Sequence, residues 1–185
     1  MSKLENLEPN RVFYYFEKLA SIPHGSRNTK AISDYLVSFA KEFDLEHYQD
    51  EANNVVIIKE ATPGYENAEP VIIQGHMDMV CEKTEDCTID FEKDGLDLYV
   101  DGDFLRAKGT TLGGDDGIAV AYALALLESK EYEHPRLEVG SCGGPEVHQA
   151  LFRLRRVLDV LREFGVEPPD ACLEVPGLEN LDVSV

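Results

Sequence analysis

The fold is decided by the stretch Pro70-Val-Ile-Ile-Gln-Gly-His-Met-Asp-Met-Val80. Its three β-favouring apolar residues, 71–73, predict a short buried strand, because the run is too brief for a helix. His76 and Asp78 follow at the carboxyl end, and residues i and i+2 of an extended chain point to the same face. An imidazole beside a carboxylate is a common way to build a metal ligand with its orienting partner. A surface histidine near a loop is the other interpretation of a lone His-x-Asp.

The composition is that of an ordinary globular protein. The 185 residues are 43% hydrophobic and 29% charged, which is enough for one well-buried domain. No apolar run is long enough to cross a bilayer and the polar start has no signal-peptide core, so we expect a cytoplasmic location. The net charge of −19 argues against binding to nucleic acid or to anionic membranes. The four cysteines form no CxxC pair and are expected to be reduced thiols: Cys81, Cys87, Cys142 and Cys172.

Hydrophobic periodicity predicts an alternation of helices and strands. Helices are expected over 9–22, 29–43 and 118–128, and strands over 55–59, 71–73, 96–100, 104–107 and 136–139. The 118–128 helix, rich in Ala and Leu, is expected to be well packed and to form the crossover of a β-α-β unit. This order predicts an α/β fold with a buried sheet. His24, in the loop after the first helix, is expected at the surface.

A second group of acidic side chains lies in the Gly-rich segment Lys108-Gly-Thr-Thr-Leu-Gly-Gly-Asp-Asp-Gly117. One Asp before a helix is explained by capping, but Asp115 and Asp116 together, framed by glycines, indicate carboxylates held where something approaches the backbone closely. Functional groups gather at the carboxyl ends of strands in open α/β sheets, so this loop is expected to meet His76. Such nitrogen and oxygen ligands suit Zn²⁺ or a similar divalent ion. The acidic segment 94–103 does not match a calcium loop and is expected to be turns and solvated surface.

Two longer stretches carry a resemblance to a known family: Gln74-Gly-His-Met-Asp-Met-Val-Cys-Glu-Lys83 and Asp101-Gly-Asp-Phe-Leu-Arg-Ala-Lys-Gly-Thr-Thr-Leu-Gly-Gly-Asp-Asp-Gly-Ile118. With the opening Ile22–Leu36, they resemble the M20 metallopeptidases, in particular the aminoacyl-histidine dipeptidase group, over roughly residues 7–139. The resemblance implies a layered α/β/α zinc-peptidase fold, often dimeric, that hydrolyses Xaa-His dipeptides with a two-zinc site. It also implies roles for four residues: His76 ligates one zinc, Asp115 bridges both, Asp78 is a catalytic-site residue that braces His76, and Asp116 shapes the loop.

The sequence departs from the family after residue 139. The family carries a Glu-Glu pair shortly after such a strand, as general base and metal ligand, whereas this chain contains no Glu-Glu and continues Gly140-Ser-Cys-Gly-Gly. The later acidic ligand, the last histidine ligand and the lid domain also have no counterpart in these 185 residues. Three residues of the tail match no family position and are expected at the surface: Glu146, His148 and Glu174.

The composition also changes near Gly140. Residues 140–185 contain no Lys, Ile, Tyr, Thr or Met. We therefore predict that 1–139 is the N-terminal part of an M20-type catalytic domain, truncated, and that 140–185 is an unrelated linker (140–145), amphipathic helix (146–164) and tail. A frameshift, a fusion or an engineered join would leave such a mark. The alternative to a dipeptidase is an inactive remnant whose tail helix caps the sheet or binds a partner. A third hypothesis, a calcium-binding or scaffolding module, is supported by the net charge alone.

Overall fold

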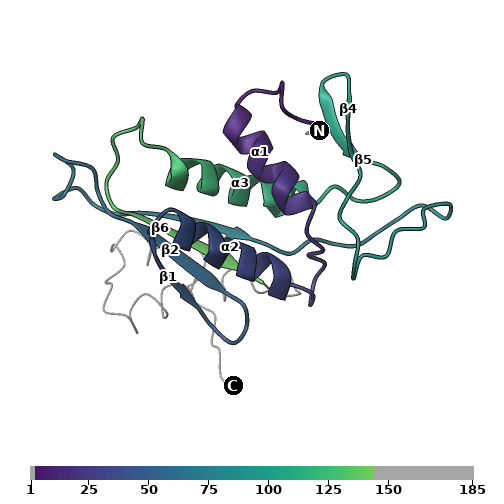
Figure 1. The fold of residues 1–185 in the computed structure, drawn as a ribbon, viewed down its shortest axis with the longest axis horizontal. Helices are drawn as coiled ribbons and strands as arrows, with labels where there is room; N and C mark the ends of the chain where they lie inside the picture. The colour runs from purple at the N-terminus through teal and green to yellow at the C-terminus, as the bar shows by residue number, and fades with distance from the viewer. Residues whose placement is uncertain (1–2, 144–185) are drawn as a thin grey trace, which may run out of the picture.

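A computed structural model of the chain describes residues 3–143. Three helices lie over one face of a four-stranded sheet, and a separate hairpin extends from one side (Figure 1). In chain order the elements are α1 (Asn10–Ala20), α2 (Lys30–Glu42), β1 (Glu46–Gln49), β2 (Val55–Lys59), β3 (Val71–His76), β4 (Leu98–Asp101), β5 (Phe104–Ala107), α3 (Gly114–Glu128) and β6 (Leu137–Cys142). The mixed α/β fold is as predicted, with one helical layer within residues 3–143.

The main sheet has the order β1-β2-β6-β3. The pairs β1–β2 and β2–β6 are antiparallel, whereas β3 and β6 are parallel and place His76 opposite Cys142. The predicted β-α-β unit is confirmed, since α3 connects the two parallel strands and packs on β3. Strands β4 and β5 form their own two-stranded sheet, with Gly102 in the left-handed conformation at the turn. The topology therefore puts the end of β3 beside the end of β6.

Most of the apolar core lies between the helices and one face of the sheet. Buried side chains of all three helices cluster there with Val55, Ile57 and Val139 of the sheet. A fully buried side chain of this size contributes about 1.5–3 kcal/mol relative to an exposed one. Strand β2 is apolar on both faces, so a second, smaller cluster of Val56, Ile58 and Cys142 lies on the opposite face. The core thus fixes β2 and β6 at the centre of the sheet.

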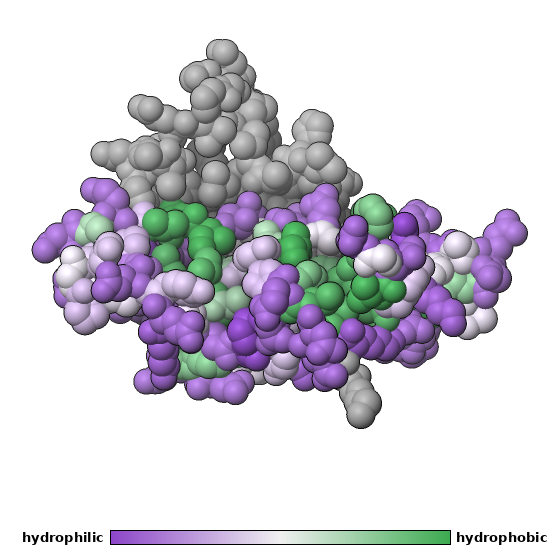
Figure 2. Space-filling view, turned by 90° about the horizontal axis from the view of Figure 1, so that it is seen from above, coloured by the Kyte–Doolittle hydropathy of each residue, from purple (hydrophilic) through white to green (hydrophobic). Residues whose placement is uncertain are grey.

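Helix α3 is apolar on nearly every side. Its buried residues face the sheet and α1, but Ile118, Tyr122 and Leu126 are 37%, 48% and 38% exposed and follow one another at four-residue intervals along one stripe. Figure 2 shows the molecule from above, with green apolar surface exposed among purple polar regions. The predicted well-packed helix is therefore correct for one face and wrong for the other.

Other expectations for the elements also need correction, and several lie outside the described residues. Strand β1 was not predicted, because its sequence Glu-His-Tyr-Gln is polar and only half-buried at the sheet edge. The linker predicted to begin at Gly140 is wrong for 140–142, which continue β6 and are buried between β2 and β3. The helix predicted over 146–164, Cys172 and the three tail residues Glu146, His148 and Glu174 are not among the described residues. None of the helices described within 3–143 is long and apolar enough to span a membrane.

Candidate metal centre

His76 is the last residue of β3, and its ring is fixed by the residues that follow. Its Nδ1 donates to the backbone carbonyl of Asp78 at 2.9 Å and lies 3.4 Å from the carboxylate Oδ1 of the same residue. The Asp78 side chain is buried and, although β3 ends at His76, its carboxylate lies beside the ring, as the His-x-Asp spacing predicted. Its carboxylate, and then that of Asp115, raise the pKa of His76 to about 9. The other ring nitrogen, Nε2, faces away from Asp78.

The irregular N-terminal end of α3 brings Asp115 to that ring nitrogen. His76 Nε2 lies 3.1 Å from Asp115 Oδ1, across 39 residues of sequence. Asp115 and Asp116 have non-helical backbone angles, so the first turn of α3 is irregular; the peptide bond between them is cis. The Asp115 side chain is 97% exposed. The two segments predicted to meet at the carboxyl end of β3 do so in the structure.

Asp116 turns back toward the strand and fixes the loop. Its carboxylate accepts a hydrogen bond from the backbone N–H of His76, and burial raises its pKa. This approach depends on Gly75, because a Cβ at that position would lie 3.0 Å from Asp116 Oδ2 and 3.3 Å from the Cβ of Ala119. Glycine at 75 therefore lets the loop come close enough for Asp115 to reach His76.

A second close approach involves Gly113 and corrects the expectation for His24. Gly113 has a φ of +70°, and a Cβ there would lie 3.0 Å from Met79 Sδ and 3.4 Å from His24 Nε2. His24 is 5% exposed, not a surface residue, and its Nδ1 donates to the carbonyl of Ile22 at 2.6 Å. Burial lowers its pKa, and the ring packs against the close approach at Gly113. The neighbouring Pro and Gly indicated an exposed loop, but tertiary packing decides its burial.

Sequence reasoning assigned no role to Ser26, which belongs to the site. Its Oγ donates to Asp78 Oδ2 at 2.7 Å, across 52 residues of sequence. The residue lies in the Ile22–Leu36 stretch that contributed to the family resemblance, and this was the one signal available. A hydroxyl partner for a buried carboxylate cannot be recognised from local spacing alone, because the two residues meet only through the fold.

The residues present fit part of a zinc site. Three carboxylates, those of Asp78, Asp115 and Asp116, surround one imidazole, and nitrogen with oxygen donors suits Zn²⁺. Only two of these side chains, His76 and Asp115, converge with free donor atoms, whereas catalytic zinc sites use three protein ligands. No group of three or more His, Cys, Asp or Glu residues able to hold a metal ion occurs within 3–143. The described residues therefore supply a partial donor set.

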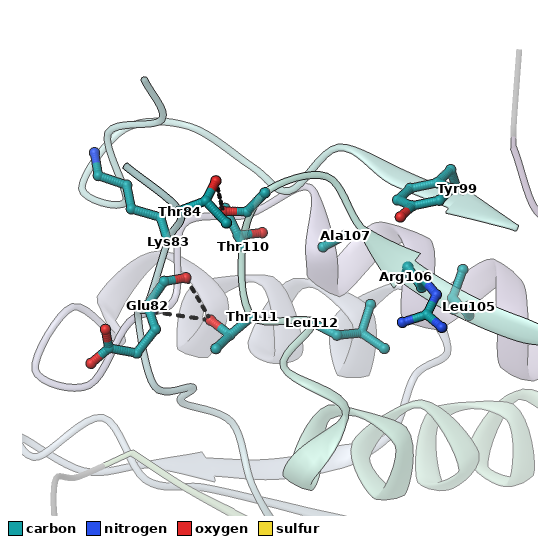
Figure 3. Close-up of a pocket in the computed structure, with 11 residues that line it drawn as sticks. Glu82, Lys83, Thr84, Tyr99, Leu105, Arg106, Ala107, Thr110, Thr111 and Leu112 are labelled. Carbon is teal, nitrogen blue, oxygen red and sulfur yellow. Dashed lines mark hydrogen bonds between the residues drawn. The ribbon is translucent and has the colours of Figure 1, made fainter. Parts of the chain in front are cut away.

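An open groove of about 620 Å³ borders the same loop (Figure 3). Residues 82–84 form one side, the β4–β5 hairpin with Tyr99 and Arg106 forms the other, and 109–112 form the floor. Figure 3 shows Thr111 bonded to Glu82; its hydroxyl also donates to the Val80 carbonyl at 2.6 Å. This bonding ties the segment after β3 to the segment before Asp115. The groove itself does not include the His76–Asp115 pair.

Comparisons with known proteins connect this arrangement to peptidases. The cytosol non-specific dipeptidase of Escherichia coli K12 is 43% identical over 139 residues, which are 75% of this chain and 29% of that protein. The crystal structure of the aminoacylhistidine dipeptidase of Vibrio alginolyticus superposes with a TM-score of 0.76 and 42% identity, over 79% of this chain and 30% of that one. A tripeptidase from Staphylococcus aureus shares the fold, with a TM-score of 0.62 and 20% identity, over 80% of this chain and 39% of that one.

No protein-family model matches the sequence. The chain spans about 30% of the length of the two dipeptidases that it matches at more than 40% identity. The likeness therefore concerns a part of those enzymes.

Proposed function

We propose, from the premise that this chain is homologous over part of its length to the M20-family dipeptidases, that it provides half of the metal centre of a dipeptidase. One observation carries the proposal: His76 Nε2 and Asp115 Oδ1 lie 3.1 Å apart, with Asp78 behind the imidazole. The substrate class that the relatives' names support is a small dipeptide, with Xaa-His dipeptides as the first candidates.

In this proposal each residue has a separate role. His76 and Asp115 would hold a divalent ion, with Zn²⁺ the expected one. Asp78 accepts a hydrogen bond from Nδ1, the ring nitrogen that faces away from the ion. This bond keeps Nε2 as the ligand nitrogen and increases its basicity. Asp116 holds the loop against β3 through the His76 N–H. A bound ion of this kind polarises a peptide carbonyl and acidifies a water molecule.

The missing acidic pair limits what these 185 residues can do alone. A general base contributes roughly 10²–10⁴-fold to the rate of such a reaction, and the sequence contains no Glu-Glu pair to supply it. We therefore expect slow zinc-dependent hydrolysis of a Xaa-His dipeptide, or none that can be measured. A cytosolic location, taken from the name of the E. coli relative, belongs to the same proposal.

Calorimetric titration of the purified chain with ZnCl₂ tests the centre directly. Wild type should bind zinc weakly, and His76→Ala should remove the binding. The matched control is His47→Ala, because His47 lies on β1 with its Nδ1 bonded to the Leu45 carbonyl and takes no part in the site. Zinc binding that survives His76→Ala, or that is lost in His47→Ala, would place the site elsewhere. Rapid zinc-dependent release of histidine from a Xaa-His dipeptide would show that the general base comes from residues that we have not assigned.

A further inference from the structure

The loop 24–26 lies directly against the residues that follow β3. Ser26 N donates to the carbonyl of Met79 at 3.0 Å, and Met79 N donates to the carbonyl of His24 at 3.0 Å. Gly25 and Met79 consequently pair as an isolated parallel bridge. These backbone bonds fix the position of Ser26 relative to Asp78, which immediately precedes Met79. The serine hydroxyl thus reaches the carboxylate without movement of either segment.

The Asp78 carboxylate is held between Ser26 and His76. Its Oδ2 accepts from Ser26 Oγ at 2.7 Å, and its Oδ1 lies 3.4 Å from His76 Nδ1. Ser26 Oγ also lies 3.3 Å from the Met79 carbonyl, so its bond to the Asp78 carboxylate is the shorter of the two. Because a carboxylate is planar and rigid, fixing one oxygen restricts the position of the other.

We infer that Ser26 is a positioning residue for the metal centre, acting on the ligand His76 through Asp78. The inference rests on the proposed function above. A serine in a loop between two helices has an ordinary structural explanation, namely a local turn. Its hydroxyl, however, bonds a buried carboxylate 52 residues away and not a neighbouring backbone N–H. The outer partners of ligating histidines typically affect metal affinity about 10–100-fold, so a residue one step further out should have a smaller effect.

The test is a double-mutant cycle read out as zinc affinity by calorimetry. Ser26→Ala should lower the affinity about threefold to tenfold, and Ser26→Thr, which keeps the hydroxyl, should restore most of it. In an Asp78→Ala background, Ser26→Ala should have no further effect, because the residue through which it acts is gone. The matched control is Ser38→Ala, since the Ser38 hydroxyl bonds the Asp34 carbonyl on α2 and should leave zinc affinity unchanged.

The outcomes separate this inference from the proposed function. If wild type binds no zinc, the proposed function fails. If wild type binds zinc and Ser26→Ala binds it equally well, the role of Ser26 is overturned. If Ser26→Ala lowers the zinc affinity equally in the wild-type and Asp78→Ala backgrounds, the role is also overturned, because the serine would then act independently of Asp78. Thermal unfolding of each variant without metal shows whether a loss of zinc affinity accompanies a loss of folding. If it does, the zinc affinity of Ser26→Thr, which keeps the hydroxyl, decides whether the hydroxyl is required.

Discussion

Two polar clusters lie at opposite ends of the main sheet, and they balance their charges differently. At the start of β6, the guanidinium of Arg136 donates to the buried carboxylate of Glu138 at 2.8 Å and also bonds Glu60. At the end of β3, the imidazole of His76 lies among the carboxylates of three aspartates, with the buried imidazole of His24 also near Asp78. The Arg136 cluster has a permanent cation for two carboxylates. In the His76 cluster the bases are titratable imidazoles.

This difference indicates why one cluster is a candidate metal centre and the other is structural. A buried carboxylate needs a compensating positive charge, and Arg136 supplies it permanently. Around His76 the surplus of carboxylates raises the pKa of the imidazole to about 9, which is the response expected where positive charge is lacking. A divalent cation would supply that charge. The titratable base, in place of a permanent guanidinium, distinguishes the β3 end from the start of β6.

The largest effect is expected from breaking the Arg136 cluster. Arg136→Met leaves the Glu138 side chain, which is 1% exposed, without its cation and should lower the free energy of unfolding by about 3 kcal/mol. Urea unfolding followed by circular dichroism measures the change. Glu60→Gln is the control, because that side chain is 72% exposed and its loss should cost less than about 0.5 kcal/mol. Equal costs for the two variants would mean that Glu138 does not depend on Arg136.

The next effect concerns the close approach that builds the His76 cluster. Gly75→Val places a branched side chain where Asp116 Oδ2 and Ala119 already lie, so the N-terminal end of α3 must move. We expect a loss of about 2 kcal/mol in unfolding free energy, together with a loss of zinc affinity. The control for zinc affinity is Gly64→Val, in an exposed loop where a Cβ meets no atom within 4 Å; its φ of +95° strains a β-branched residue, so the comparison is made on zinc affinity and not on stability. A Gly75→Val variant that keeps wild-type zinc affinity would show that the loop position is not required.

A smaller effect should follow from pH and separate the two clusters. The folded pKa of His76, about 9, is above its ordinary value of 6.5, so its stabilising contribution is complete below pH 6.5 and is lost as the pH rises toward 9. With EDTA present, wild type should lose about 1 kcal/mol more unfolding free energy than His76→Gln between pH 6.5 and 9, after allowance for solvent screening. Arg136 does not titrate in this range. Parallel pH profiles for the two proteins would contradict the prediction.

The sequence predicted the elements that have a periodic apolar pattern and missed those that depend on tertiary context. Helix α2 and strand β2 lie within a residue of their predicted ranges, because their buried residues recur at regular spacing. Strand β1 has no such pattern, since it is a polar edge strand held by pairing with β2. Gly140–Cys142 resembled a linker, yet it is buried between two strands.

The site shows the same division. The His-x-Asp spacing predicted the contact between His76 and Asp78, and the family resemblance pointed to Asp115. Ser26 and the burial of His24 were missed, because both depend on a loop that is distant in sequence.

The exposed stripe on α3 has another origin. A helix that is hydrophobic all round is typical of the interior of a larger fold, and this chain spans only about 30% of the dipeptidases it matches.

The smallest effect on stability, and the sharpest separation of stability from binding, is expected from Asp115→Asn. The side chain is 97% exposed and its one described contact is with His76 Nε2, so unfolding free energy without metal should change by less than about 0.5 kcal/mol. Zinc affinity should nevertheless fall at least about tenfold, since the amide is a poor substitute for an anionic ligand. Asp103→Asn, at the hairpin turn, should change neither quantity. If Asp115→Asn instead destabilised the metal-free protein as much as Arg136→Met, Asp115 would be a structural partner of His76, and the two ends of the sheet would not differ in the way proposed.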